Sequence, residues 1–361
     1  MAVLEVIALV LTLLAITLEL EKRVARFEVC NGGTAACPCR RGALKPGLGN
    51  QEYNMRKARL LMCLLSGALI AGCTSPTKEA TVGPKSIWCN QRYLPEQDAI
   101  QRVTDDLHLS VARNGYLFAL IGAYVLQKQN AEGNANHFDL PWRIRQVEAH
   151  HVKIDDSGFE ARNFVVYDKD TNAVSEVVIA LTGSDDVADW LTNFSLSKRQ
   201  YEQAAGYVRR MSAVYPDRKF VVTGYSLGGA LAVHVTKNRE TSPLIDAAWV
   251  FNPSPKTWAD SSVDKRIWHA ATASDILKVA RWPIFRILPG VAYVGAPPQQ
   301  RAEDYYLIDT NPIYAHYRWA LARNILHMAD LAVLKASNGA AETSEPLEIL
   351  KLSRFKACPT R

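Results

Sequence analysis

Apolar and polar positions divide the chain into segments with different periods. Between residues 110 and 126 the apolar positions recur at the spacing of a packed helix, and the period changes from residue 144. Residues 158–168 and 173–181 are rich in β-forming residues, and the polar tetrapeptide 169–172 between them is typical of a hairpin turn. We therefore expect a helix followed by a β-hairpin.

After the hairpin, predicted helices and strands alternate. In chain order they are a helix at 200–214, a strand at 219–223, a helix at 227–237, strands at 246–251 and 266–272, and a terminal helix from about Tyr314. This alternation is typical of a mostly parallel sheet with crossover helices on both faces, so the predicted fold class is α/β. We expect residues 73–361 to form a single domain, because a segment of this length can bury a full core.

The distribution of charged residues along the chain argues against nucleic acid as a partner. The 361 residues include 42 Lys and Arg against 36 Asp and Glu, and 48% of them are hydrophobic. Residues 1–72 hold 9 basic and 5 acidic side chains, which leaves 33 and 31 for the rest. Most of the basic excess therefore lies in a predicted leader, and we expect no nucleic-acid partner.

Residues 55–72 have the organisation of a signal peptide. A charged start at 55–59 precedes an apolar run at 60–70 that is too short to span a bilayer, and small residues then precede Cys73. This order resembles the bacterial lipoprotein box, in which the signal is cut before the cysteine and the cysteine is lipidated. A buried helix with an incidental cysteine is the alternative.

The lipoprotein interpretation predicts how the mature chain is attached to the cell. Cys73 would carry the acyl chains, and residues 73–87 would form a tether to the domain. Thr74 in place of Asp resembles lipoproteins that are sorted to an outer membrane. We expect a protein of the cell envelope, anchored by lipid, in the outer membrane of a Gram-negative bacterium.

Residues 1–54 do not fit this interpretation, because a signal peptide begins its chain. We expect them to be a non-native upstream extension, with Met55 as the start, or a membrane segment, since 2–20 is largely apolar. This segment also contains three cysteines without the paired spacing of a metal site: Cys30, Cys37 and Cys39. No metal site is expected from them.

Cysteine usage predicts one disulfide. After removal of the signal and lipidation of Cys73, the mature chain keeps only Cys89 and Cys358. Export into an oxidising compartment favours their pairing, which would join the two ends of the domain. Two free thiols are the alternative, because spacing alone does not bring two α-carbons within disulfide distance.

The strongest chemical motif is G-x-S-x-G, formed by Gly224, Ser226 and Gly228. It lies between an apolar predicted strand and a helix of small residues, which is the context of a nucleophile elbow. The sharp turn leaves no room for β-carbons beside the serine, and Ser226 Oγ would project above the sheet. Leu227, at the start of the helix, would donate its N–H to an oxyanion. The alternative is a packing turn with an idle serine.

A second segment makes a family resemblance specific. A strand ending in Gly183-Ser184, followed by Trp190 and then by G-x-S-x-G-G-A-L-A about forty residues later, resembles the class 3 lipase family of the α/β-hydrolase fold. The resemblance implies that Ser184 supplies the other oxyanion donor, although a helix N-cap is an alternative role. This chain has Thr182 where the family usually has Arg, so the hydrogen bonds around the glycine are expected to differ.

A serine nucleophile needs a base and a group that orients the base. α/β hydrolases place them in the chain order Ser, Asp, His. Asp275 follows the predicted strand 266–272 and resembles the family's Asp-x-Val-Pro segment. A solvated loop carboxylate is the alternative reading of Asp275.

Two histidines are candidates for the base. His316 follows a break at Asn311-Pro312, which we expect to end a strand at 305–309, and lies where a loop meets a helix. His327 falls inside that helix, and eleven residues of helix separate the two by roughly 16 Å. We predict His316 as the base and keep His327 as the alternative.

The sequence therefore predicts a lipid-anchored serine hydrolase that cleaves carboxylic esters without a metal or cofactor. Acyl lipids are the expected substrates, of the triacylglycerol lipase or phospholipase type, and the apolar run at 282–288 is a candidate acyl site. An esterase or thioesterase for small soluble substrates is one alternative. A non-catalytic envelope lipoprotein that keeps the hydrolase scaffold is the other.

Overall fold

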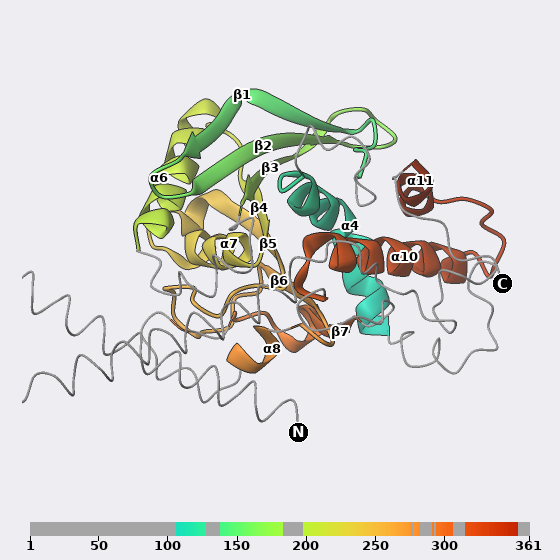
Figure 1. Ribbon diagram of the computed structural model, residues 1–361. Helices are drawn as coiled ribbons and strands as arrows, with labels where there is room; N and C mark the ends of the chain where they lie inside the picture. Colours follow the sequence, from blue (N-terminus) through green and yellow to red (C-terminus); the bar gives the residue numbers. More distant parts are fainter. Residues whose placement is uncertain are drawn as a thin grey trace, which may run out of the picture. The chain divides into compact units, whose positions relative to one another are not determined.

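A mostly parallel sheet forms the centre of the computed structural model (Figure 1). The structure describes residues 106–127, 138–182, 198–275, 277–281, 291, 294–305 and 315–352. These residues belong to one compact unit of the chain, Ala80–Trp190 with Leu196–Arg361.

Seven strands of the described residues lie in the sheet in chain order. They are β1 (Ile144–Ile154), β2 (Phe159–Tyr167), β3 (Val174–Leu181), β4 (Phe220–Tyr225), β5 (Ile245–Phe251), β6 (Ile267–Thr272) and β7 (Arg301–Tyr305). β1, β2 and β3 pair antiparallel, and the pairs from β3 to β7 are parallel. The parallel strands all end at the same edge, which is where side chains from different strands can meet.

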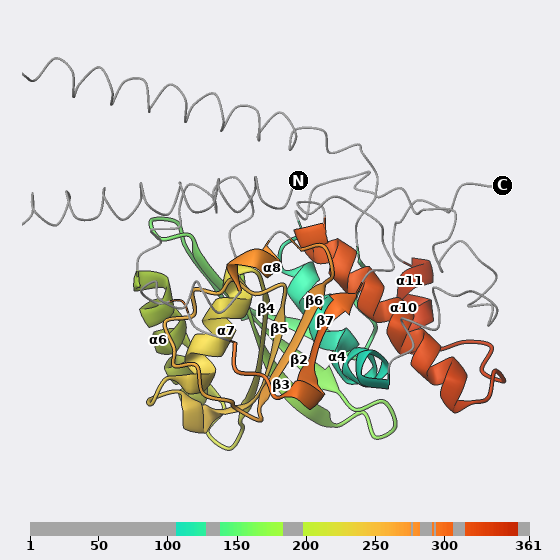
Figure 2. The same cartoon turned by 90° about the horizontal axis from the view of Figure 1, so that it is seen from below.

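Helices cover both faces of the sheet, as Figure 2 shows. One face packs against α6 (Arg199–Val214) and α7 (Leu227–Lys237), and the other against α4 (Asp106–Tyr124) and α10 (Arg318–Ala336). The short helix α8 (Leu277–Ala280) follows β6, and α11 (Glu345–Leu352) packs against α10. Two 3-10 turns, Ser242–Leu244 and Pro298–Gln300, precede β5 and β7.

The two helical layers explain the composition of the inner strands. Every residue of β4 is buried. Val221 and Tyr225 belong to the core beneath α4 and α10, whereas Phe220 and Val222 belong to the core beneath α6 and α7. The sequence of a parallel strand that is covered on both faces is a continuous apolar run. The spacing of apolar residues alone therefore distinguishes such a strand poorly from a buried helix.

The predicted α/β fold class and its sheet with helices on both faces are confirmed. The helix predicted at 227–237 has those bounds as α7, and the turn predicted at 169–172 joins β2 to β3. The strand predicted at 305–309 meets β7 at Tyr305, and residues 306–309 lie outside the described residues, whereas the start of β7 at Arg301 was not predicted. Arg301 and Glu303 interrupt the apolar pattern of β7 with charges, so its period is obscured.

Helix α11 is held to the sheet by a charged contact that sequence pattern does not predict. Arg143 donates to both carboxylate oxygens of Glu345 at 2.7 Å, and Tyr116 donates to the same carboxylate. These side chains come from the turn before β1, from α11 and from α4. The contact therefore joins three elements that are far apart in the chain.

The predicted leader and its consequences lie outside the described residues. This applies to the signal peptide at 55–72, lipidation of Cys73, and the disulfide between Cys89 and Cys358, which stay predictions.

Among the described residues, no helix is both long enough and apolar enough to cross a bilayer.

Candidate active site

Ser226 occupies the sharp turn between β4 and α7. Its backbone has φ 53° and ψ −119°, a conformation that costs an L-residue free energy and persists where the surroundings enforce it. The Ser226 N–H donates to the carbonyl oxygen of Phe251 at 3.0 Å, and the Ser226 carbonyl oxygen accepts from the N–H groups of Ala230 and Ser254. These bonds fix the serine against β5 and the first turn of α7.

The turn requires glycine at position 224. A β-carbon there would lie 2.4 Å from the carbonyl carbon of Gly228 and 2.7 Å from the carbonyl oxygen of Leu181. Both are backbone atoms, which cannot move away as a flexible side chain could. The G-x-S-x-G spacing is thus a packing requirement of the strand, the turn and the helix.

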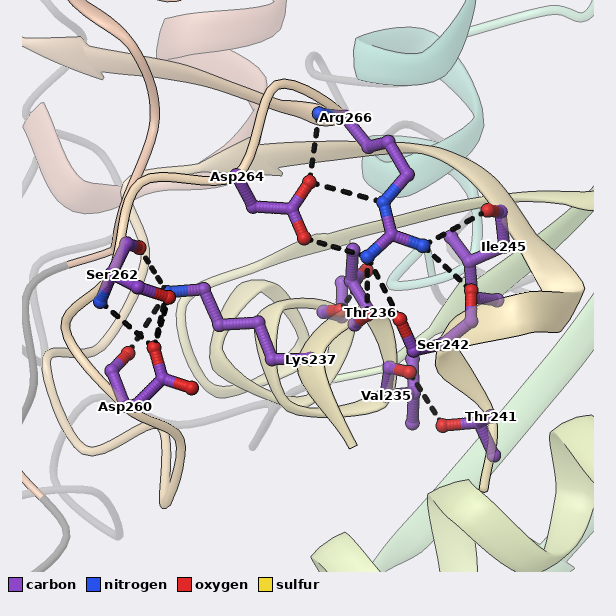
Figure 3. A network of polar contacts seen from close by, with 11 residues as sticks. Val235, Thr236, Lys237, Thr241, Ser242, Ile245, Asp260, Ser262, Asp264 and Arg266 are labelled. Carbon is purple, nitrogen blue, oxygen red and sulfur yellow. Dashed lines mark hydrogen bonds and ion pairs between the residues drawn. The ribbon is translucent and has the colours of Figure 1, made fainter. Parts of the chain in front are cut away.

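The C-terminus of α7 is also fixed, by the polar network of Figure 3. Arg266 donates to the carbonyl oxygen of Thr236 at 2.9 Å, and Thr241 donates to the carbonyl oxygen of Val235. Asp264 holds the guanidinium of Arg266 through Nε at 3.0 Å and Nη2 at 2.6 Å. Cations and donors at a helix C-terminus satisfy its last carbonyls, so α7 is anchored at both ends.

Three of the predicted site residues form a hydrogen-bonded series. Ser226 Oγ lies 2.9 Å from Nε2 of His316, and Nδ1 of His316 lies 2.7 Å from Oδ1 of Asp275. His316 lies two residues before α10, and Asp275 follows β6. Ser226 is half-buried, whereas His316 and Asp275 are buried, so the serine is the member of the series that solvent reaches.

Asp275 is ionised within this series. Burial opposes ionisation of its carboxyl group, but Arg281, His316 and the hydrogen bonds from His316 and the Leu277 N–H outweigh burial and lower its pKa to about 2. A carboxylate that is ionised throughout the physiological range accepts from Nδ1 of His316 and leaves Nε2 as the acceptor for the Ser226 hydroxyl.

Asn252 connects the loop of His316 to two strands. It lies directly after β5 with φ 41°, and its side-chain amide donates to the carbonyl oxygen of Ala315 at 3.1 Å. Its side-chain oxygen accepts from the Thr272 N–H at 2.9 Å, and Thr272 Oγ1 donates to the same Ala315 carbonyl at 2.8 Å. Asn252 therefore fixes the distance between the end of β6, which precedes Asp275, and the segment of His316.

Arg281 contacts the second oxygen of the carboxylate. Its Nη2 lies 2.8 Å from Oδ2 of Asp275, and its Nη1 donates to the carbonyl oxygen of Pro253 at 3.1 Å. Neither Asn252 nor Arg281 was predicted from the sequence. An Asn-Pro step that ends a buried strand is a signal for Asn252, but no local pattern distinguishes Arg281 from a surface arginine.

The other histidine candidate lies away from the series. His327 is inside α10, and burial together with Arg323 holds the pKa of His327 well below its usual value. The structure therefore brings His316, and not His327, to Ser226.

The two predicted oxyanion donors differ in what the structure describes. Leu227 is the first residue of α7, where a backbone N–H has no acceptor within its own helix. Ser184 and Trp190 lie outside the described residues, as does the apolar run 282–288. Thr182 is described, and its N–H and hydroxyl both donate to the carbonyl oxygen of Glu160, at 3.0 and 2.8 Å. The threonine at this position thus binds the neighbouring strand β2.

No group of three His, Cys, Asp or Glu side chains in the described part of the chain is arranged to hold a metal ion.

Comparison with known proteins relates part of the chain to lipolytic enzymes. Residues 138–252 match the model of a Tle-like phospholipase domain. The chain is also similar to secreted mono- and diacylglycerol lipase 1 of Fusarium solani, with 33% identity over 81 residues. That alignment covers 17% of this chain and 24% of the relative, so the chain spans about a quarter of the curated relative it matches.

Solved structures similar to this one are also lipases. Lip2 lipase from Yarrowia lipolytica has a TM-score of 0.36 and 14% identity, covering 58% of this chain and 93% of its own. A Rhizomucor miehei lipase has a TM-score of 0.35 and 12% identity, covering 60% of this chain and 78% of its own. The family match and the curated relative confirm the predicted resemblance to lipases for the matched part of the chain.

Proposed function

We propose that this protein is a serine hydrolase that cleaves the carboxylic esters of acyl lipids. The observation that carries the proposal is the series from Ser226 through His316 to Asp275, with separations of 2.9 and 2.7 Å. The match of residues 138–252 to a phospholipase-like domain supports a lipid ester as the substrate class.

The geometry supports attack by Ser226 on an acyl carbonyl. Nε2 of His316 takes the hydroxyl proton as the Oγ–carbon bond forms, and the carbonyl electrons move to the oxygen. The Leu227 N–H at the start of α7 stabilises that oxyanion, and we propose Ser184 as the second donor. When the intermediate collapses, His316 returns the proton to the leaving alcohol, and water then releases the fatty acid from Ser226 by the same steps.

The proposal extends to attachment at a membrane. The signal-like segment 55–72 followed by Cys73 supports lipidation of that cysteine, which would hold the enzyme at the surface that contains its substrate. Mass spectrometry of the membrane fraction should find an acylated Cys73 as the mature N-terminus. Intact peptides from residues 1–54 in that fraction would contradict this part of the proposal.

Labelling with a fluorophosphonate tests the nucleophile directly. The wild-type protein should be labelled at Ser226, whereas Ser226→Ala should be folded and unlabelled. Absence of labelling in the folded wild-type protein would overturn the hydrolase function and favour a scaffold without catalysis.

A series of ester substrates tests whether acyl lipids are the substrate class. Release of fatty acid from phosphatidylcholine vesicles, from diacylglycerol emulsions and from p-nitrophenyl butyrate should show higher kcat/KM for the long-chain lipids. Activity confined to the soluble butyrate would reject acyl lipids as the substrate class.

A further inference from the structure

The positively charged guanidinium of Arg281 lies beside the carboxylate of Asp275. It follows α8, and its side chain is 8% exposed, while the side chain of Asp275 is 0% exposed. His316 contacts Oδ1 and Arg281 contacts Oδ2, at 2.7 and 2.8 Å. One buried carboxylate is thus shared between an arginine and an imidazole.

The contact with Arg281 is an ion pair rather than an aligned hydrogen bond. The aligned bond of Arg281 goes instead to the carbonyl oxygen of Pro253, in the segment that follows β5. The guanidinium therefore joins the segments that follow β5 and β6. Its interaction with Asp275 is mainly electrostatic, because it is not an aligned hydrogen bond.

We propose that Arg281 is a positioning residue that joins the segments of Pro253 and Asp275 and, by sharing the negative charge of Asp275, sets the lower pH limit at which Ser226 is activated. This inference rests on the proposed hydrolase function. It assigns a role to a residue outside the Ser226, His316 and Asp275 series.

The direction of the effect follows from the charges. Asp275 stabilises a proton on His316, whereas the positive charge of Arg281 on the far side of the carboxylate opposes it. Without Arg281, the full negative charge of Asp275 would act on the imidazole of His316. Since a protonated imidazole cannot accept the Ser226 proton, the acid limb of kcat/KM would move upward.

Other titratable or charged groups of the described residues reach this cluster from β6 and β7: His269, Glu303 and Arg301. Burial, together with the charges of Arg281 and Arg301, holds the pKa of His269 well below its usual value, so His269 is neutral in the range considered. Glu303 lies 3.9 Å from Nε of Arg281, 3.5 Å from Nε of Arg301 and 3.7 Å from His269. Its carboxylate is partly exposed, so Asp275 is the closer and more deeply buried partner of Arg281.

The test compares pH profiles of Arg281→Met and Arg281→Lys with the wild-type protein, using p-nitrophenyl butyrate. We expect Arg281→Met to lower kcat about tenfold to a hundredfold and to move the acid limb of kcat/KM upward by roughly 0.5 to 1 pH unit. Arg281→Lys keeps the charge, so its acid limb should stay near that of the wild type. Arg301→Gln is the matched control, because it removes a neighbouring arginine paired with Glu303, and it should leave the limb in place.

Circular dichroism and thermal unfolding establish that each variant is folded. If Arg281→Met does not fold, Arg281→Gln, which can still donate to the Pro253 carbonyl, carries the same expectation. A folded, neutral variant whose acid limb coincides with the wild type would overturn the inference, as would an equal shift in Arg301→Gln. Failure of the hydrolase function itself would be recognised separately, as absence of fluorophosphonate labelling in the wild-type protein.

Discussion

Asn252 holds the backbone of His316. Its side-chain Nδ2 lies 3.1 Å from the carbonyl oxygen of Ala315 and 3.4 Å from that of His316 itself. Both residues are buried, and 64 positions separate them in the chain. His316 is therefore placed by the end of β5, as well as by its bond to Asp275.

Replacement of Asn252 by glycine should test the hydrogen bonds of its side chain without adding backbone strain. Glycine tolerates the φ of 41°, so Asn252→Gly removes the amide without adding a steric penalty. Loss of a buried hydrogen-bonding side chain costs about 1–3 kcal/mol. We expect kcat to fall about tenfold to a hundredfold and KM to stay nearly unchanged. The range follows because about 1.4 kcal/mol corresponds to a factor of ten in rate.

Asn163 provides the control for Asn252. It is also fully buried, and its Oδ1 accepts from the Tyr207 hydroxyl at 2.7 Å within the opposite part of the sheet. Asn163→Ala should lower the free energy of unfolding by a similar amount and leave kcat unchanged. Equal losses of kcat in the two variants would show that stability alone explains the effect.

His316→Ala should lower activity, whereas His327→Ala should lower stability. We expect His316→Ala to lower kcat/KM at least about a thousandfold, as for loss of a triad member, because Ser226 then has no proton acceptor. His327→Ala removes a half-buried side chain from α10 and should lower the midpoint of thermal unfolding instead. An active His316→Ala beside a folded, inactive His327→Ala would reverse the assignment of the base.

The ionised Asp275 predicts a loss of stability in acid. Its pKa in the folded protein is lowered from 3.8 to about 2, so its contribution is fully present above about pH 4 and disappears as the pH falls through 2. At 1.36 kcal/mol per pKa unit the contribution is about 2 kcal/mol. Urea unfolding of wild type and Asp275→Asn should show their difference in unfolding free energy shrinking by this amount between pH 4 and pH 2. A constant difference would mean that Asp275 gains nothing from its ionised partners.

Alanine at two glycines should have opposite effects. Gly224→Ala places a β-carbon 2.4 Å from backbone, so we expect loss of folding or of the nucleophile turn. Gly206, inside α6, has open space, with its closest neighbour 3.8 Å away at the end of the Arg209 side chain. Gly206→Ala should raise the free energy of unfolding by about 0.5–1 kcal/mol. Thermal unfolding and fluorophosphonate labelling of both variants test this contrast.

The parts of the site that sequence predicts are those that depend on neighbours in the chain. Ser226 and Leu227 follow from a strand, a turn and a helix in contact, and Asp275 follows from its place after a strand. The same reasoning does not find Arg281, because its role depends on Asp275 and Pro253 meeting in the folded structure. Likewise, Asn252 acts on a loop more than sixty residues away.

The two helical layers have a consequence for how activity develops as the chain folds. Ser226 is presented by α7 on one face of the sheet, and His316 precedes α10 on the other. A folding intermediate with only one layer docked therefore has a serine without its base, or a base without its serine. Recovery of turnover during refolding should therefore lag behind recovery of helical structure.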